Sequence, residues 1–430
     1  MTRNFTNLLL ACGLFALPVF FTACIQDECI SKRTFRLYTP VMKNQAEVRN
    51  DVVSSAPRDV IKPGKIYLLG NYILLNDVDR GIHVIDNSDP SSPKNVSWID
   101  IPGNMDMAAK GNMLYVDFYS ELLAIDMTDP LNVHVAGYKP DVFPVRYYTS
   151  TIASGDEQIV ADWIIRDTTI NDWCDIDQSG GNPVIFSSNV FSQDISAYNS
   201  TGSQSNSGPQ GVGGSMARFT VSGNFLYTVS INSLSAIDIS NPAEPVSKSV
   251  TRLAYGTETI FPFNNELFIG SQTGMYRFDL GNPAQPREIG LFSHVQSCDP
   301  VIADEKYAYV TLRSGNSCQG FSNQLDIINL EQANANDPFQ LLVTHQMTNP
   351  HGLGKDGDLL FICDGPDGLK VFDSKDIYHL RHLKTIPMEA HDVILHNKRA
   401  LVIAKDGVYQ FNYANPANIS LLSKVNLQKF

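Results

Sequence analysis

Four titratable residues stand at corresponding places ahead of strand-like runs and could do chemistry together: Glu258, Asp299, His351 and His391. They recur at intervals of about forty to fifty residues, which places them at one level if the runs between them stack. Carboxylates and imidazoles bind divalent metals, and either group can act as a general base. The set is therefore compatible with a metal-dependent hydrolase or lyase, in which Asp299, His351 and His391 hold a metal of unspecified type and Glu258 is a ligand or base. The favoured interpretation of the column is nevertheless a solvated polar rim, because the mouth of a propeller must be wet, and the metal or catalytic centre is the alternative.

A second polar column lies beside the first. The first column also contains Met105 and Ala217, and the second consists of Lys65, Asp106, Arg146, Arg218 and Asp392. Because successive strand residues point to opposite faces, only one of the two columns is expected to face inward.

The first thirty residues carry a targeting signal. Arg3 precedes an apolar stretch over residues 8–21, which is too short to span a bilayer as a helix and is typical of a secretory signal. The stretch ends in Phe21-Thr-Ala-Cys24, which resembles a bacterial lipobox, so Cys24 is the predicted lipidation site. The acidic residues Asp27 and Glu28 resemble the export signal of Bacteroidetes surface lipoproteins. An ordinary cleaved signal peptide with an incidental cysteine is the alternative.

The sequence thus predicts a lipoprotein signal peptide over 1–23 and a lipid-anchored tether over 24–57. The protein is expected to be anchored in the outer membrane and exposed on the cell surface. Its 32 Lys and Arg against 45 Asp and Glu give a net charge of −13, which repels phosphate backbones. No nucleic-acid partner is therefore expected.

An apolar strand followed by Asp and a turn recurs along the rest of the chain. In seven copies the key residue is Asp86, Asp126, Asp238, Asp279, Asn329, Asp373 or Asn412. The two copies with Asn leave the geometry of their turns open. A four-stranded module of about 40 residues cannot bury both faces alone, so radial stacking is expected. We predict an all-β fold, a β-propeller over residues 58–430.

One interval, between Asp126 and Asp238, is much longer than the others. Residues 141–213 of this interval hold two strand-like runs and a Ser/Gly/Asn-rich stretch. They form either a degenerate eighth blade or an insertion into a seven-bladed wheel. Seven blades are favoured, because the third-strand signature is absent from this region.

The copies Ile82-His-Val-Ile-Asp86, Leu122-Leu-Ala-Ile-Asp126 and Leu234-Ser-Ala-Ile-Asp238, each followed by Asn or Asp and Pro, resemble the LVIVD-repeat family of bacterial and archaeal surface propellers. The resemblance covers roughly residues 58–427. It implies a propeller fold and an envelope location, and it implies no activity.

Two cysteines are predicted to form a disulfide on the same face as the polar columns. Cys298 begins the first strand of one blade, and Cys318 lies in a long loop of that blade. A bond between them closes about 20 residues, a constraint on the order of 3 kcal/mol. The alternative is two free thiols, and the pairing of Cys29, Cys174 and Cys363 stays open.

The favoured interpretation is a surface lipoprotein whose propeller is a binding or scaffold module for a protein or a glycan. The metal-dependent enzyme is the alternative, and its divalent metal is the only cofactor considered. The last blade looks complete, which leaves its outer strand as an open edge. The strand-like run Thr34–Thr39 is predicted to pair with that edge; a tether without any pairing is the alternative.

Overall fold

The computed structural model describes residues 32–147, 153–154, 157–171, 212–294, 300–314, 322–331 and 339–426. Contacts divide the chain into a larger unit, Pro40–Trp163 with Ser188–Phe430, and a smaller one, Met1–Thr39 with Ile164–Ser187. The larger unit contains the blades. None of the described helices has the length and the apolar character that a membrane span requires.

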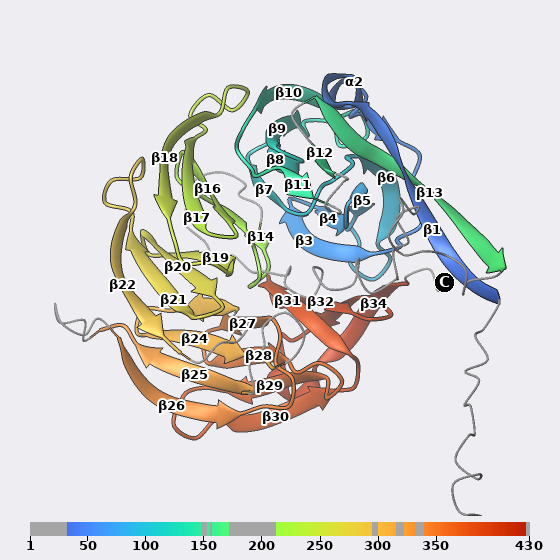
Figure 1. Ribbon diagram of the computed structural model, residues 1–430. Helices are drawn as coiled ribbons and strands as arrows, with labels where there is room; N and C mark the ends of the chain where they lie inside the picture. The colour runs from blue at the N-terminus through green and yellow to red at the C-terminus, as the bar shows by residue number, and fades with distance from the viewer. Residues whose placement is uncertain are drawn as a thin grey trace, which may run out of the picture. The chain divides into compact units, whose positions relative to one another are not determined.

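Seven four-stranded antiparallel blades, numbered in chain order, form a β-propeller (Figure 1). Blade 1 consists of β3 (Pro63–Leu69), β4 (Tyr72–Asp77), β5 (Gly81–Asp86) and β6 (Lys94–Asp100). Blade 2 consists of β7 (Met107–Lys110), β8 (Met113–Phe118), β9 (Glu121–Asp126) and β10 (His134–Lys139). Blade 3 consists of β15 (Phe219–Ser222), β16 (Phe225–Ser230), β17 (Ser233–Asp238) and β18 (Val246–Arg252). Blade 4 consists of β19 (Thr257–Phe263), β20 (Glu266–Ser271), β21 (Gly274–Asp279) and β22 (Arg287–Ser293).

The remaining three blades have the same order of strands. Blade 5 consists of β23 (Val301–Ala303), β24 (Tyr307–Leu312), β25 (Gln324–Asn329) and β26 (Gln340–Gln346). Blade 6 consists of β27 (Leu353–Asp356), β28 (Leu359–Cys363), β29 (Leu369–Asp373) and β30 (Arg381–Ile386). Blade 7 consists of β31 (Ala390–His396), β32 (Arg399–Ala404), β33 (Gly407–Asn412) and β34 (Ser420–Asn426). First strands of successive blades contact one another, so they line the centre.

The predicted seven-bladed fold is confirmed, and the described part of residues 141–213 contains no four-stranded blade. The described part of this region contains β11 (Arg146–Tyr147), β12 (Ala153–Ser154), β13 (Gln158–Asn171) and β14 (Val212–Gly213). Of these, β11 pairs with β12, whereas β14 pairs with β3 and adds a strand to blade 1. The region is therefore an insertion between blades 2 and 3.

The same kind of turn follows the third strand of every blade, and an Asp or Asn side chain holds it by accepting a main-chain N–H. The key Asp or Asn accepts a main-chain N–H two residues later, at 2.7 to 3.1 Å. The acceptors are Asp86, Asp126, Asp238, Asp279, Asn329, Asp373 and Asn412. An amide oxygen accepts this bond as a carboxylate does, so the two Asn copies make the same turn as the five Asp copies.

The run Thr34–Thr39 forms a strand, but the predicted partner is wrong. It belongs to β1 (Lys32–Asn44), which pairs with β13 in a two-stranded sheet, and Gln45 N–H bonds the Glu157 carbonyl beside it at 3.0 Å. The reason is length: a 14-residue strand offers a longer backbone ladder than the seven-residue β34.

The chain after β1 packs on blades 1 and 2. Helix α2 (Gln45–Asn50) begins at Asn44, whose side chain accepts the N–H groups of Ala46 and Glu47. Arg49 of α2 forms a bidentate ion pair with Glu121 at 2.7 and 2.8 Å. Strand β2 (Ser54–Ser55) then pairs with β6. Elsewhere, in blade 7, a short 3-10 helix, η4 (Pro416–Asn418), precedes β34. The later part of the segment 24–57 is therefore structured.

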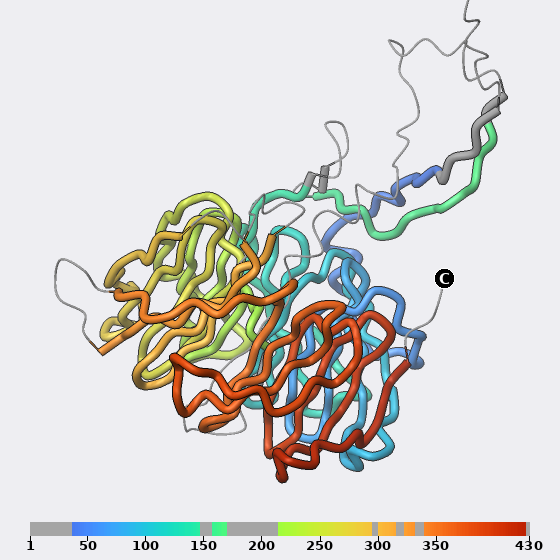
Figure 2. Tube along the Cα trace, turned by 90° about the horizontal axis from the view of Figure 1, so that it is seen from below, coloured from blue at the N-terminus to red at the C-terminus, as the bar shows by residue number. Residues whose placement is uncertain are grey.

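The wheel closes by side-chain packing between blades 1 and 7, which lie side by side in Figure 2. Apolar residues of both blades, including Ile73 and Leu401, form one buried cluster. The side-chain amides of Asn87 and Gln410 exchange hydrogen bonds at 3.0 and 2.7 Å across this boundary. Strand β14 pairs with β3 and contacts β31, so it bridges the first strands of the first and last blades. Closure thus needs no strand exchange between the chain ends.

Candidate functional site at one end of the propeller

Charged and imidazole side chains from all seven blades gather at the centre of one end of the propeller. Each lies at or just before the start of a first strand, apart from one that follows a second strand. We call these residues the mouth cluster: Lys65, Asp106, Arg218, Glu258, Arg313, His351, His391 and Asp392. All but Arg218 and His391 are at most 8% exposed. Burial at this level is unusual for charged groups, which are normally kept in water.

Bulges at the starts of three first strands bring the two predicted columns together. The pairing register skips residues at Lys65 in β3, at Glu258 in β19 and at His391 in β31. An extra residue interrupts the alternation of faces and re-aims its side chain. Arg218 and Lys65, from one column, accordingly act on the charge of Glu258, from the other. Buried residues of both columns therefore belong to the mouth cluster, and which column faces inward stays a prediction.

Lys65 and Asp106 form a buried ion pair, with 3.7 Å between Nζ and Oδ2. Lys65 also donates to the Met216 carbonyl, and Asp106 accepts the main-chain N–H of Arg218 at 2.6 Å. Burial lowers the pKa of Lys65 to about 8, although Asp106 opposes the shift. Burial likewise raises the pKa of Asp106, against the effect of Lys65. The pair holds the chain entering blade 3 against blades 1 and 2.

The segment between β14 and β15 lies across the mouth cluster. The Ser215 hydroxyl accepts the N–H of Leu353 at 2.8 Å and lies 3.5 Å from Oδ1 of Asp392. The Ala217 carbonyl accepts the N–H of Ile260 at 2.6 Å. This segment therefore touches blades 4, 6 and 7 as well as blade 1.

Glu258 shares its site with an amide and with basic groups. Its Oε1 accepts from Nε2 of Gln272 at 3.0 Å. Burial raises the pKa of Glu258, while Gln272, Arg218 and Arg313 act in the opposite direction. The carboxyl is thus easier to protonate than an exposed glutamate.

His351 and His391 are brought into contact by the close approach of blades 6 and 7. Their ring centroids are 5.1 Å apart in an edge-to-face arrangement. Gly352 permits this approach, because a Cβ there would lie 2.1 Å from Oδ1 of Asp392. Burial, Arg313 and His391 hold the pKa of His351 well below its ordinary value. Burial also lowers the pKa of His391, with smaller effects from charged neighbours. Both rings are neutral near pH 7.

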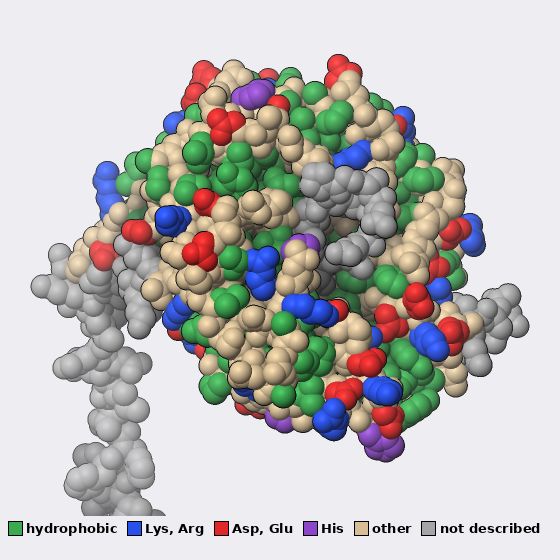
Figure 3. Space-filling model, turned by 180° about the vertical axis from the view of Figure 1, so that it is seen from behind, with side chains coloured by type: hydrophobic (Ala, Val, Ile, Leu, Met, Phe, Trp, Pro, Cys, Tyr) green, Lys and Arg blue, Asp and Glu red, His purple; other side chains and the backbone are tan. Residues whose placement is uncertain are grey.

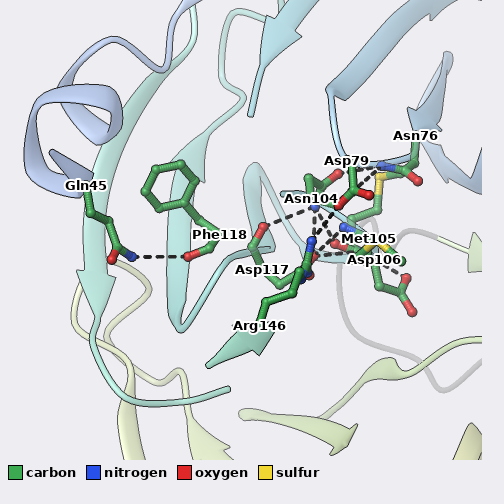
Figure 4. A network of polar contacts seen from close by, with 10 residues as sticks. Gln45, Asn76, Asp79, Asn104, Met105, Asp106, Asp117, Phe118 and Arg146 are labelled. Atoms are coloured by element: carbon green, nitrogen blue, oxygen red, sulfur yellow. Dashed lines mark hydrogen bonds and ion pairs between the residues drawn. The ribbon is translucent and has the colours of Figure 1, made fainter. Parts of the chain in front are cut away.

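A polar network beside the cluster is centred on Asp117 (Figure 4). Its Oδ1 accepts the main-chain N–H groups of Met105 and Asp106 at 2.8 and 2.9 Å, and Nδ2 of Asn104 at 2.9 Å. Asn104 in turn accepts from Nδ2 of Asn76 at 2.7 Å, which joins blade 2 to blade 1. Carboxylate oxygens thus position the chain just ahead of β7.

Arg146 of the insertion reaches into this network, as Figure 4 shows. The sequence placed Arg146 in the second column, but it lies on β11 rather than on a blade. Its Nη1 lies 2.5 Å from Oδ1 of Asp79, and its Nη2 lies 3.6 Å from Oδ2 of Asp117. Burial raises the pKa of Asp117 to about 6, although Arg146 opposes the shift.

Residues at the ends of second strands form part of this face, as meander topology predicts for the loops that begin at Asp77, Arg313 and Asp364, although the sequence did not single out these side chains as site residues. Asp77 accepts two consecutive main-chain N–H groups, of Ile61 and Lys62, and Asp364 accepts those of Thr348 and Asn349. Gln272 and Arg313 follow the second strands of blades 4 and 5 directly. Their shared position after the second strand was the available signal. Meander topology puts strand ends there on the same face as the starts of first strands.

Several predicted residues lie outside the described residues: Cys24, Asp299, and the predicted disulfide partners Cys298 and Cys318. Lipidation and the disulfide therefore stay predictions. Cys363 is a free, buried thiol. Of the four proposed metal ligands, the structure brings His351 and His391 into contact and places Glu258 near Arg313. No group of three or more metal-ligating side chains occurs in the described part of the chain.

Outside the cluster, charges of both signs are mixed on the surface. Figure 3 shows acidic and basic side chains interspersed on one face of the molecule. Exposed ion pairs such as Lys398–Asp356, at 2.7 Å, are typical of this surface. Such pairs contribute little to stability, because water screens them.

A family model matches two parts of the chain, residues 63–100 and 213–251, and its description is the LVIVD repeat. The first match coincides with blade 1 and the second with blade 3 and its approach. The chain contains LVIVD repeats. The resemblance seen in the sequence is thus confirmed on two complete blades.

Solved structures with the same fold have little sequence in common with this LVIVD-repeat chain. A periplasmic gluconolactonase of Pseudomonas aeruginosa matches with a TM-score of 0.53 and 11% identity, over 84% of this chain and 96% of the other. A protein from Lactobacillus plantarum matches with a TM-score of 0.51 and 12% identity, over 85% and 97%. No curated protein sequence matches the chain. At this identity the likeness shows the propeller fold alone.

Proposed function

We propose that this protein is a surface-exposed lipoprotein whose propeller binds a protein or a glycan at the mouth cluster. The observation that carries the proposal is the gathering of charged and imidazole groups from all seven blades at one place, most of them buried. Buried ion pairs are often less stabilising than apolar residues of the same size. A buried ion pair together with further buried charged groups at the end of a propeller is therefore better explained by ligand recognition than by stability.

Exposed apolar side chains beside the cluster provide a contact surface for a ligand. Tyr255 is 69% exposed and Ile231 is 43% exposed. They lie together, because the N–H groups of Gly256 and Thr257 both bond the Ile231 carbonyl, at 2.7 and 3.1 Å. An aromatic ring on this face can pack against a sugar ring or an apolar side chain.

Binding is tested with the full-length protein by calorimetric melting in the presence of a panel of oligosaccharides and extracellular proteins. At a fixed ligand concentration, a ligand that binds more tightly raises the melting temperature more. We expect a panel member to stabilise the wild type and to stabilise Tyr255→Ala less. The matched control is Tyr378→Ala, which removes an exposed tyrosine from an outer turn. Absence of any stabilising member, or an equal loss in both variants, would contradict binding at this face.

The lipid anchor is tested separately from binding. Cys24→Ala removes the predicted lipidation site, and Cys29→Ala is the matched control. We expect only the first variant to lose fatty-acid labelling and to leave the outer-membrane fraction. Protease treatment of intact cells should digest the wild-type protein. A Cys24→Ala variant that still carries lipid, or a wild-type protein that resists the protease, would contradict the proposal.

A metal-dependent hydrolase or lyase is the competing hypothesis. Its support is the contact of the two neutral imidazoles, which could bind a divalent metal. The positive charge of Arg313, which lowers the pKa of both imidazoles, opposes the binding of a cation there. Elemental analysis of protein purified without chelator decides the question. Roughly one metal per chain, lost in the His351→Ala, His391→Ala double variant, would favour the enzyme.

A further inference from the structure

Strands β1 and β13 form a sheet of two strands, and within the described residues no third strand pairs with either of them (Figure 1). Each strand therefore has one edge whose main-chain donors and acceptors lack a partner strand. Strand β13 is better suited to further pairing, because its 14 residues contain no Pro or Gly, whereas β1 contains Pro40. Sheets of two strands are marginally stable in water, so a further strand would stabilise this one.

Two hydrogen bonds identify the open edge of β13. The Glu157 carbonyl, just ahead of β13, accepts the N–H of Gln45, just after β1, so the strands are antiparallel. The Val160 carbonyl accepts from the Tyr119 hydroxyl instead. Main-chain groups alternate between the two edges along a strand. We therefore expect the even-numbered residues beyond Val160 to face away from β1.

Side chains on both faces of this part of β13 reach solvent. Ile164 is 42% exposed, and Ile165, on the opposite face, is 55% exposed. The Arg166 side chain makes no hydrogen bond or ion pair in the part of the chain that the structure describes. Asp162 accepts the N–H of Trp163 at 2.8 Å through Oδ1, so its Oδ2 can accept from another donor. The strand thus presents an acid, a base and two aliphatic side chains to a neighbour.

We propose that β13 pairs with β13 of a second copy of this chain, antiparallel and centred on Ile164. In this register Asp162 lies opposite Arg166 of the second copy, and Ile164 lies opposite Ile164. Trp163 lies opposite Ile165. The two-fold axis repeats each unlike pair. Opposite charges and aromatic–aliphatic pairs are cross-strand neighbours that stabilise a sheet. The result is one four-stranded sheet shared by two chains.

Other centres lose this complementarity. A centre at Ile165 sets Ile164 opposite Arg166, and a centre at Trp163 sets Ile164 opposite Asp162. Both place an apolar side chain against a charge, which gives up the ion pair and the aliphatic contact together. The sequence of β13 is therefore complementary to itself in one register, and this selects a second copy as the partner. The inference is independent of the ligand proposed for the mouth cluster.

Charge reversal tests the register. Sedimentation velocity of the full-length protein in detergent, over a range of concentrations, measures dimerisation. We expect the wild type to dimerise, and Asp162→Arg or Arg166→Asp to weaken the dimer by about tenfold, because each sets like charges opposite one another twice. An equimolar mixture of the two variants should form a heterodimer, since its charges are again opposite. The matched control is Arg287→Asp, whose side chain is 71% exposed on β22 and which should dimerise as the wild type does.

A cysteine at the centre of the pairing gives a second readout. In the proposed register the two copies of Ile164 lie opposite one another, with Cα atoms about 5.5 Å apart, which a disulfide can bridge. We expect oxidation to link Ile164→Cys chains through this residue, as identified by mass spectrometry of unreduced peptides. The matched control is Thr168→Cys on the same strand, because its two copies would lie roughly 26 Å apart along the sheet.

Each outcome decides the proposal. A heterodimer formed from two variants that dimerise weakly alone, together with the Ile164→Cys link, supports it. A wild type that stays monomeric at every concentration overturns it, as expected if another segment of the same chain covers the edge of β13. A dimer that the charge variants leave unchanged, or one linked equally well through Thr168→Cys, also overturns it. Circular dichroism checks that every variant is folded.

Discussion

The turns that follow the third strands and the mouth cluster are built from the same seven blades in opposite ways. At the turns, all seven blades place Asp or Asn at one position, and each side chain makes the same bond to the main chain. At the mouth, the corresponding residues differ from blade to blade in charge and chemistry, from Lys65 to His351. The residues that recur in every blade stabilise the propeller fold, and the residues that differ from blade to blade form the candidate site.

The largest effect is expected from removing a buried carboxylate on the mouth face. Asp364→Ala leaves the N–H groups of Thr348 and Asn349 without their acceptor, and the ammonium of Lys370 keeps only Asp367, at 3.4 Å. We expect the free energy of unfolding to fall by about 3 to 5 kcal/mol, because unsatisfied buried donors and charges are costly. Denaturant unfolding followed by circular dichroism measures the change. A loss as small as that of a turn variant would remove the contrast between the two regions.

The next effect is a pH dependence at Asp117. Its pKa of about 6 in the folded protein lies above the ordinary value of 3.8. The folded state therefore holds this proton more tightly than the unfolded state. Above about pH 6 the buried carboxylate is charged, which lowers the free energy of unfolding. As the pH falls towards 4 the carboxyl is protonated in the folded protein, and the free energy of unfolding rises again. We expect the stability of the wild type relative to Asp117→Asn to rise by up to about 3 kcal/mol between pH 7 and pH 4. A difference independent of pH would show that Asp117 has an ordinary pKa.

Closure of the wheel gives a smaller effect. Gln410→Ala removes the amide that exchanges hydrogen bonds with Asn87 and donates to Ser423 at 3.0 Å. We expect a loss of about 2 kcal/mol, because Asn87 is part-buried and keeps fewer partners. Melting temperatures of Gln410→Ala, of Asn87→Ala and of the double variant together measure the coupling. Additive losses would mean that the amides do not act as a pair.

The smallest effect is expected at a single turn. Asp126→Ala removes one side-chain bond to the Thr128 N–H, at 2.7 Å, near solvent. A loss of about 1 kcal/mol or less is expected, because water can replace the acceptor. The control is Asn412→Asp, which keeps the acceptor and should leave the melting temperature nearly unchanged. A large loss in the control would show that Asn and Asp are not equivalent in these turns.

The fold was predictable from the sequence because its signals are local and repeated. A strand, an acceptor side chain and a turn recur with Asp86, Asp126 and Asp238, and each copy alone gives the same interpretation. The partner of Thr34–Thr39 was not predictable in this way. Its pairing with β13 joins segments separated by more than a hundred residues, and strand-like runs carry no information about which partner they choose.

The site was predictable only in part. Spacing identified Glu258, His351 and His391, because the repeat places them at the starts of first strands. Bulges at Glu258 and His391 were not visible, since a bulge depends on pairing between strands. Topology places the loop that begins at Arg313 on the same face, but the effect of Arg313 on the pKa of the imidazoles arises only when blades 5, 6 and 7 come together.

Hydrogen exchange measured by mass spectrometry, with and without a ligand that stabilises the wild type in the melting panel, tests the central claim most directly. Ligand binding at the mouth should slow amide exchange in peptides covering Thr348–Leu353 and Glu389–Val393, which hold His351 and His391. Peptides covering the third-strand turns, such as Asp126–Leu131, should exchange at the same rate in both conditions. Protection at the turns with none at the mouth, or no protection anywhere, would contradict the assignment of ligand binding to the residues that break the repeat.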